Sequence, residues 1–396
     1  MPPDSKLLAT PTKRLLAIDG GGVRGLLAIE ILGHLESVLR ESLGAGDTFR
    51  LADYFDFVGG TSTGAILATC LALGMPVAQI RDIAVAAARD MFSKAGFERR
   101  FWYKYDDAHI ASRLRDVFQG FLTDEDRAAG HTDITLGTAS LRTLLLVVMR
   151  NATTDSPWPV SNNPRAKFND RSRADCNLGI PLWQLVRAST AAPTYFPPEE
   201  VQLGDERYLF VDGGVTPYNN PALLLFVMAS AAPYRLEWPA GADRMLLVSV
   251  GTGRVRHARP GLRAADLNVL YNAAAIPNAL LSATQVEQDL LCRTFGRCRK
   301  GDVIDQEAGA LIDDPGTEAG RAVPPLFTYL RYDADLSEAG LAALGLSQLR
   351  PDLVQQLDAV DSIEALQSIG VAAGRQVEPS DFAGFLGQQA IKQSSP

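Results

Sequence analysis

A serine stands at the centre of a Gly-x-Ser-x-Gly pentapeptide at residues 60–64 (GTSTG), after the apolar run FDFV and before the apolar segment AILATCLAL. In a nucleophile elbow the serine occupies a sharp strand-to-helix turn whose crowded backbone requires small neighbours, and Gly60 and Gly64 satisfy that requirement. The N-terminus of the following helix also offers unpaired N–H groups to a developing oxyanion. The pattern favours Ser62 as a nucleophile, and a glycine-rich turn in which Ser62 caps a helix is the alternative.

A second glycine-rich loop, IDGGGVRG at residues 18–25, again lies between a strand pattern and a helix pattern. Gly20, Gly22 and Gly25 match the G-x-G-x-x-G fingerprint of dinucleotide-binding loops, which makes a nucleotide-binding module a competing hypothesis. That fingerprint requires an acidic residue at the end of the next strand, and residues 41–54 (ESLGAGDTFRLADY) show no such strand. Successive backbone N–H groups bind an oxyanion as readily as a phosphate, so both loops fit one hydrolytic site.

A carboxylate ends the strand-like segment ERYLFVD at Asp212, and Gly213 and Gly214 follow it. A serine nucleophile needs a base, and α/β folds place their chemistry at the carboxyl ends of strands. Asp212 is therefore a candidate base, although Asp-Gly-Gly also fits an ordinary turn.

The elements that would position these residues alternate between strand and helix patterns. Buried strands are predicted at 14–19, 55–58, 142–150, 206–212 and 244–251, and helices at 25–43, from 62, and at 76–92. Several of the strand segments are apolar on both faces, which is typical of a parallel sheet covered by helices on both sides. We therefore expect an α/β fold with a mostly parallel sheet.

Two regions depart from that alternation. Residues 151–178 are polar and rich in Asn, Pro and Arg, and they are expected to form an exposed loop or flap. From residue 336 onward the chain reads as short amphipathic helices followed by a polar tail.

Composition excludes several classes of protein. The 396 residues are 46% hydrophobic and 21% charged, as in an ordinary globular protein, and the net charge of −8 argues against a nucleic-acid partner. The four cysteines lack zinc-site spacing and are expected to be reduced thiols. The N-terminal residues show no secretory signal, and the apolar run at 221–233 is shorter than the ~20 residues of a membrane span, so a cytoplasmic location is expected.

Together the motifs resemble the patatin-like phospholipase family. The resemblance rests on DGGGVRG (19–25), GTSTG (60–64) and DGG (212–214), supported by RASTAAPTYFPP (187–198) and NNPA (219–222), all in family order. It implies a three-layer α/β/α sandwich related to cytosolic phospholipase A2. It also implies a catalytic domain at 12–335, a helical C-terminal extension at 336–387, and a disordered tail at 388–396.

The resemblance further implies a lipid acyl hydrolase with a Ser-Asp dyad and no metal or organic cofactor. Ser62 would be the nucleophile, Asp212 the base, and the amides of Gly21, Gly22 and Thr63 the oxyanion hole. The remaining motif residues are Gly20, Arg24, Gly25, Gly60, Gly64, Gly213 and Gly214, and Arg24 fits either a lipid phosphate or a structural ion pair.

The expected partner is a glycerophospholipid or another acyl lipid at a membrane or micelle surface. FERRFWYKY (97–105) mixes aromatic and basic residues and suits either an interfacial patch or a partly buried aromatic cluster. Some bacterial relatives act as regulated effectors or toxins, so a small-molecule or protein activator is an open hypothesis, and the sequence does not define an oligomeric state.

A Ser-His-Asp esterase or peptidase is a further rival. The order Ser, Asp, His leaves His257 as the one histidine downstream of Asp212. His257 has three arginines around it (GRVRHARPG), and their charges disfavour the imidazolium that a catalytic base must become. The sequence therefore favours a dyad over a triad.

Overall fold

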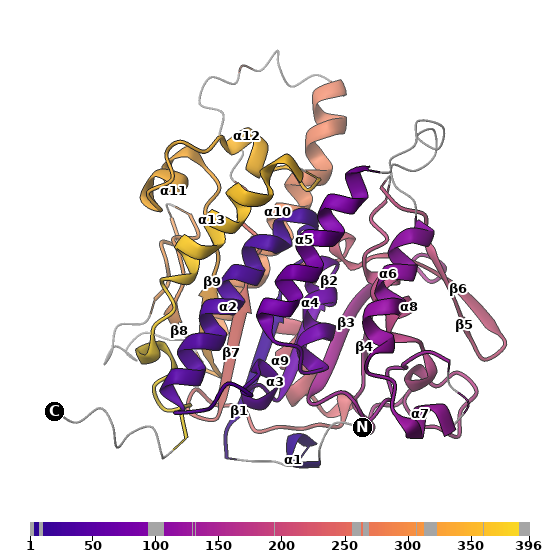
Figure 1. Cartoon of the computed structure of the whole chain (residues 1–396). Coiled ribbons are helices and arrows are strands. Elements are labelled where there is room, and N and C mark those ends of the chain that lie inside the picture. Colours follow the sequence, from indigo (N-terminus) through magenta and orange to yellow (C-terminus); the bar gives the residue numbers. More distant parts are fainter. Residues whose placement is uncertain are drawn as a thin grey trace.

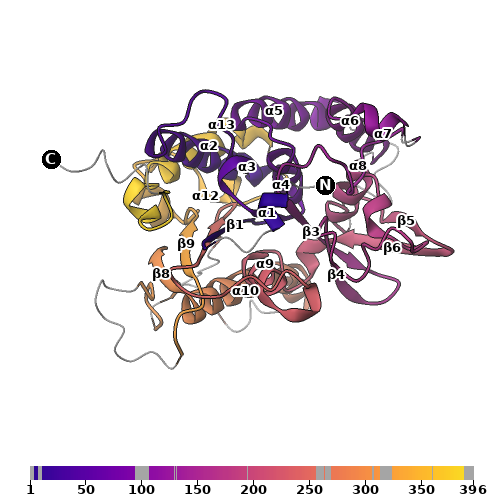
Figure 2. The same ribbon diagram turned by 90° about the horizontal axis from the view of Figure 1, so that it is seen from below.

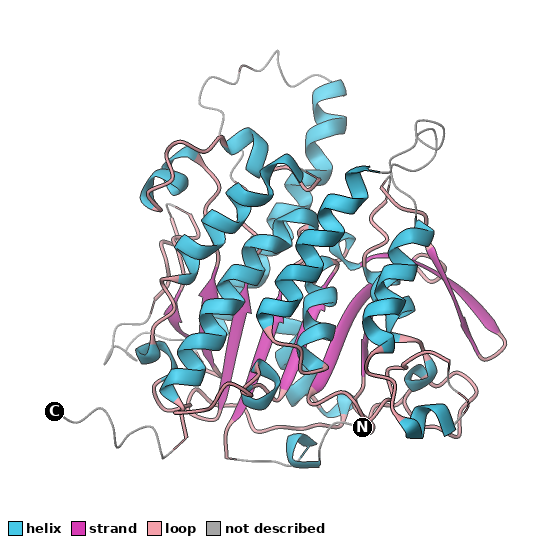
Figure 3. Ribbon diagram, in the orientation of Figure 1, coloured by secondary structure: helices cyan, strands magenta, loops and turns pink. Residues whose placement is uncertain are grey.

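The computed structural model describes residues 4–387 except for 8–10, 94–106, 129, 131, 194, 256–262, 264–268, 306, 313–322 and 359. Helices cover both faces of one central sheet, which gives the three layers of an α/β/α sandwich (Figures 1 and 3). The aromatic and basic segment 97–105 and the tail at 388–396 fall outside the described residues.

Nine strands of the described residues form the sheet, in the order β5-β6-β3-β2-β1-β7-β9-β8, with β4 paired to β3. Their bounds are β1 Lys13–Ile18, β2 Phe57–Thr61, β3 Leu144–Asn151, β4 Ser156–Ser161, β5 Glu199–Leu203, β6 Glu206–Asp212, β7 Met245–Val250, β8 Arg297–Lys300 and β9 Thr328–Tyr332. The ladders β3-β2-β1-β7-β9-β8 are all parallel, whereas β4, β5 and β6 join by antiparallel pairing. The expected mostly parallel α/β/α fold is confirmed.

The strands are apolar on both faces because each face packs against helices. In β1, Leu16 and Ile18 belong to the core on one side of the sheet, and Leu15 and Ala17 belong to the core on the other. Figure 2, which views the molecule from below, shows one helical layer with α2, α5, α6, α8 and α13, and an opposite layer with α9 and α10. The helix bounds are α1 Asp4–Leu7, α2 Gly25–Ser42, α3 Leu51–Tyr54, α4 Thr63–Ala72, α5 Val77–Ser93, α6 Asp107–Gln119, α7 Asp124–Ala128, α8 Leu182–Ser189, α9 Ala222–Ser230, α10 Val269–Phe295, α11 Glu338–Ala343, α12 Pro351–Val354 and α13 Ile363–Gly374.

The segment expected to be a loop at 151–178 contains strand β4, so that prediction was wrong for residues 156–161. Pro157 and Pro159 read as turn residues in the sequence. In the structure β4 pairs with β3 alone, and prolines are tolerated in edge strands because a missing N–H there faces no partner strand.

The C-terminal helix α13 lies along α2 (Figure 1). Gly370 allows this close approach, since a Cβ at that position would come within 2.4 Å of the Leu27 carbonyl oxygen. Leu366 and Ile369 of α13 are buried in the same core as Leu27 of α2. Among the described helices, none combines the length and apolar character needed to cross a bilayer.

The junction of three strands sets the position of the candidate site. Parallel strand β2 pairs with the first part of β3 and ends at Thr61, opposite Val148. Antiparallel strand β6 pairs with the last part of β3 and ends at Asp212, opposite Met149. Because β4 occupies the other edge of β3, β2 and β6 share one edge and their carboxyl ends meet there head to head.

Candidate active site

Ser62 follows β2 directly and precedes α4, as the elbow motif predicts. Its backbone adopts φ 54° and ψ −126°, a conformation that is strained for a residue with a side chain. Gly60 and Gly64 must be small here, because a Cβ on Gly60 would lie 2.0 Å from the Gly64 carbonyl oxygen. The strain and the small neighbours together raise the serine hydroxyl at the end of the sheet.

The Ser62 hydroxyl is hydrogen bonded to the carboxylate of Asp212. Ser62 Oγ donates to Asp212 Oδ2 over 2.6 Å, and the amide of Gly214 donates to Asp212 Oδ1, also over 2.6 Å. Both carboxylate oxygens are therefore held in place, and one of them lies within proton-transfer distance of the serine.

Burial sets the acidity of Asp212, whose side chain is almost completely enclosed. Desolvation raises the pKa of Asp212 from 3.8 to about 6, against the opposing effects of the hydrogen bonds from Ser62 and Gly214 and of the charge on Arg187. The carboxylate is thus ionised at neutral pH but is a stronger base than an exposed aspartate.

Ser189 holds the backbone of the elbow. Its hydroxyl accepts a hydrogen bond from the Ser62 amide (2.9 Å) and donates one to the Val148 carbonyl (2.6 Å). The side chain is fully buried at the end of α8. Sequence reasoning did not single out this residue, although it lies within the RASTAAPTYFPP segment that supported the family resemblance.

The glycine loop before α2 packs against the elbow. A Cβ on Gly20 would lie 3.1 Å from Ser62 Cβ, and Gly22 has φ +59°, which favours glycine. Within the described residues, the amides of Gly21, Gly22 and Thr63 donate no hydrogen bond to the protein. These are the three amides that the family resemblance implies for an oxyanion hole.

The next amide in the loop has a partner from the far end of the chain. Val23 N donates to the Leu357 carbonyl oxygen over 2.9 Å. Leu357 follows α12, and nothing in its sequence context indicates such a contact. The C-terminal segment therefore touches the loop that carries the free amides.

Arg24 is a buried cation beside this loop, with a side chain only 7% exposed. Burial lowers its pKa to about 10, with Asp333 and Asp19 opposing the shift, so it stays positively charged at neutral pH. No hydrogen bond or ion pair joins its guanidinium to any described residue. Asp19, the nearby carboxylate of the same motif, is instead bound by both terminal nitrogens of Arg331 (2.9 and 2.7 Å).

The other motif glycines lie in the same cluster. A Cβ on Gly25 would meet the Thr63 side chain at 2.3 Å, and one on Gly213 would meet the Val148 carbonyl oxygen at 2.3 Å. All three motifs that the sequence singled out therefore converge on the end of β2.

Histidines are absent from the contacts of Ser62 and Asp212 in the part of the chain that the structure describes. His34 lies on α2 against Gly374 of α13. The side chains of His109, His131 and His257 are outside the described residues. No group of His, Cys, Asp or Glu in the described residues has the arrangement of a metal site.

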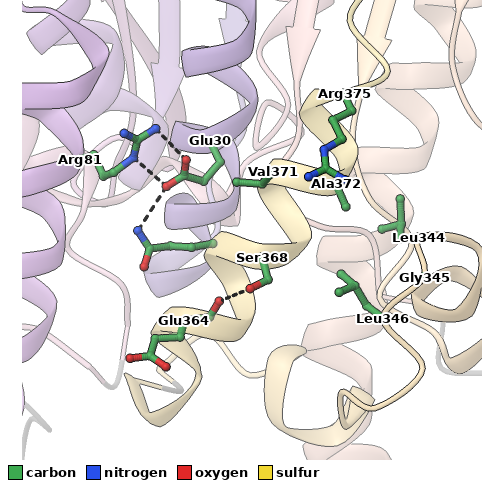
Figure 4. A pocket seen from close by; sticks show the side chains of 11 residues that line it. Glu30, Arg81, Leu344, Gly345, Leu346, Glu364, Ser368, Val371, Ala372 and Arg375 are labelled. Atoms are coloured by element: carbon green, nitrogen blue, oxygen red, sulfur yellow. Dashed lines mark hydrogen bonds and ion pairs between the residues drawn. The ribbon is translucent and has the colours of Figure 1, made fainter.

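A groove of about 670 Å³ opens elsewhere, between α2, α5, α13 and residues 344–346 (Figure 4). Glu30 lies at its wall and is bound by Arg81 at 2.7 and 2.6 Å and by Gln367 at 3.2 Å. Neither Ser62 nor Asp212 lines it. Arg81 and Gln367 bind the buried acid Glu30, and the groove contains neither the candidate nucleophile nor the candidate base.

Comparison with known proteins gives a family match over the segment that contains Ser62 and Asp212. Residues 16–226, just over half of the chain, match the family described as patatin-like phospholipase. The chain is 29% identical to patatin-like protein 2 of Arabidopsis thaliana, covering 60% of this chain and 59% of the relative. It is 30% identical to patatin-17 of Solanum cardiophyllum, covering 60% of each.

A bacterial relative also matches. The chain is 30% identical to the cGAMP-activated phospholipase of Vibrio cholerae over 53% of this chain and 56% of the relative. The chain thus spans about three fifths of the length of the relatives it matches. With the family match over more than half of its length, this chain belongs to the patatin-like phospholipase family.

Proposed function

We propose that this protein is a lipid acyl hydrolase that cleaves fatty-acyl esters of glycerolipids through Ser62 and Asp212. The observation that carries the proposal is the 2.6 Å hydrogen bond from the strained serine to the buried carboxylate, beside amides for which the described residues provide no acceptor. Membership of a phospholipase family supports the same reaction class.

The first half of the reaction transfers the acyl group to the enzyme. Ser62 Oγ attacks the ester carbonyl carbon while its proton moves to Asp212 Oδ2. The carbonyl oxygen becomes an oxyanion, which receives hydrogen bonds from the amides of Gly21, Gly22 and Thr63. When the tetrahedral intermediate collapses, the alcohol oxygen leaves with the proton from Asp212, and an acyl ester of Ser62 remains.

The second half releases the fatty acid. Asp212 takes a proton from water, the resulting hydroxide attacks the acyl ester, and Ser62 Oγ recovers the proton as the carboxylic acid departs. A base with a pKa of about 6 suits both directions of transfer, because it is ionised at neutral pH and still binds a proton when the transition state requires it.

Arg24 favours a phospholipid over a neutral lipid as the substrate. Arg24 is a buried cation two residues beyond Gly22, and its guanidinium makes no hydrogen bond or ion pair with a described residue, so it can supply the charge that a headgroup phosphate needs. The substrate would be presented at a membrane or micelle surface.

The test is an acyl-release assay on phosphatidylcholine vesicles with wild-type protein and the Ser62→Ala variant, together with labelling by a fluorophosphonate probe. We expect fatty-acid release and labelling by the wild type and neither by Ser62→Ala. Ser230→Ala is a matched control, because this serine donates to the Phe226 carbonyl on α9 and does not contact the site.

Fatty-acid release by a folded Ser62→Ala protein would contradict the proposal. Labelling without lipid hydrolysis would favour a general esterase or peptidase instead. Tight binding of NAD or ATP by an unlabelled wild-type protein would favour a nucleotide-binding module.

Regulation by a small molecule is the second part of the proposal, and it rests on the printed name of the V. cholerae relative. The same vesicle assay with and without cGAMP tests it. A higher rate with the nucleotide would support activation, and equal rates would exclude this nucleotide as the activator.

A further inference from the structure

The direction of an oxyanion-hole amide is set by the peptide plane to which it belongs. In a trans peptide the C=O of one residue and the N–H of the next are coplanar and point in opposite directions. The N–H of Gly21 therefore points away from whatever binds the carbonyl oxygen of Gly20.

Thr252 binds that carbonyl. Its hydroxyl donates to the Gly20 oxygen over 2.8 Å, and a longer contact of 3.4 Å comes from the Asn219 side chain. Thr252 is 1% exposed, so no water competes for the bond. The parallel register of β1 and β7 brings the two residues together, since Ile18 pairs with Val250 and each chain continues for two residues beyond that pair.

Thr252 also packs on the neighbouring residue of the loop. A Cβ on Gly21 would lie 2.2 Å from Thr252 Oγ1 and 2.5 Å from Thr252 Cβ. The peptide between Gly20 and Gly21 is thus fixed by a hydrogen bond at its oxygen and by close packing at the following Cα.

We infer that Thr252 is a positioning residue that aims the Gly21 amide at the oxyanion by holding the Gly20 carbonyl. The inference rests on the proposed hydrolase function. Thr252 lies outside the family match at 16–226 and outside the motifs of the sequence analysis. Its contribution comes through Gly21 and not through contact with the substrate.

Two substitutions separate the hydroxyl from the shape of the side chain. Thr252→Val puts a methyl group in place of the hydroxyl; a methyl cannot donate, and it needs about 3.3 Å from a carbonyl oxygen, so the peptide must rotate. We expect kcat to fall by about 10- to 100-fold, with KM changed by no more than about twofold. Thr252→Ser keeps Oγ and should retain nearly wild-type kcat.

Thr143→Val is the matched control. Thr143 is also fully buried and donates to a backbone carbonyl, that of Phe55, over 2.9 Å. It lies at the opposite end of the strands from Ser62. This variant should lose comparable thermal stability and keep wild-type kcat.

A second readout reports on the oxyanion itself. A trifluoromethyl ketone lipid analogue forms a tetrahedral adduct with the serine, and its affinity should fall in Thr252→Val by the same factor as kcat/KM. Unchanged kcat and analogue affinity in a folded Thr252→Val protein would overturn the inference. So would a Thr252→Ser variant as impaired as Thr252→Val. A wild-type protein that neither labels nor hydrolyses would instead defeat the proposed function itself.

Discussion

Replacing Asp212 by Asn should make the protein more stable at neutral pH while it removes activity. Folding raises the pKa of Asp212 from 3.8 to about 6. The folded state therefore holds this proton more tightly than the unfolded state, so the free energy of unfolding falls as the pH rises from about 4 to 6. Each pKa unit is worth about 1.4 kcal/mol, which gives a cost of roughly 3 kcal/mol above pH 6.

Asparagine is uncharged at every pH and keeps the shape of the side chain. Its oxygen can accept from the Gly214 amide, and its NH₂ group then faces Ser62 Oγ, which leaves the serine proton without a base. We expect the unfolding free energy of Asp212→Asn to exceed that of wild type by up to about 3 kcal/mol at pH 8 and by almost nothing at pH 4. We expect kcat/KM to fall by about 10²- to 10⁴-fold.

Urea unfolding of both proteins at a series of pH values measures the stability difference. Asp205→Asn is the control, since this carboxylate is exposed in the turn between β5 and β6 and stays in water in both states. A stability difference for Asp212→Asn that is the same at pH 4 and pH 8 would refute the reasoning about burial.

The same carboxylate should produce the acid limb of the activity profile. Wild-type kcat/KM should rise as the pH passes about 6. An ordinary histidine titrates near pH 6.5, so the limb alone does not distinguish a dyad from a triad. The pair of variants does: an active Asp212→Asn beside an inactive His257→Ala would exclude the dyad.

Three further variants test the surroundings of the nucleophile. Gly22→Ala should lower kcat by about 100- to 1000-fold, because the position has φ +59° and a Cβ there would lie 2.4 Å from the Leu357 oxygen; kinetics beside thermal melting decide this, and a folded protein with normal kcat would contradict it. Ser189→Ala should slow fluorophosphonate labelling of Ser62 by about tenfold, since the elbow amide loses its partner, and labelling at the wild-type rate would argue against that role. Arg24→Gln should raise KM for a phospholipid more than for a neutral acyl ester, and equal effects on the two substrates would count against a phosphate contact.

The sequence indicated the individual residues of the candidate site because each of them has a local signature. Glycines two positions on either side of Ser62 require a tight turn, and a carboxylate ends the strand pattern at Asp212. Both signals depend on residues that are close in the chain. The parallel strands were equally visible, since burial on both faces leaves continuous apolar runs.

The contact between Ser62 and Asp212 could not be predicted in the same way. It depends on two strands that pair with the same edge of β3. Parallel β2 pairs with the first part of that edge and ends at Thr61, and antiparallel β6 pairs with the last part, in a sheet that is otherwise mostly parallel. The side chains that hydrogen bond to the backbone of the site could not be predicted either, because Ser189 and Thr252 bond to residues more than a hundred positions away in the chain. Single hydroxyl groups at such distances leave no periodic pattern in a sequence.

The unit that supports the site is larger than the region that matches the family. Residues 16–226 contain Ser62 and Asp212. Strand β1, however, pairs along its whole length with β7 at Met245–Val250, and Leu247 of β7 is fully buried. A chain cut at residue 226 would turn β1 into an exposed apolar edge and would lose the Thr252 contact to Gly20. The Leu357 contact to Val23 extends the same dependence into the C-terminal segment. We therefore expect the glycine loop at residues 20–22 to depend on residues from both ends of the chain. Substitutions outside the family region should then alter the proposed catalysis without changing Ser62 or Asp212.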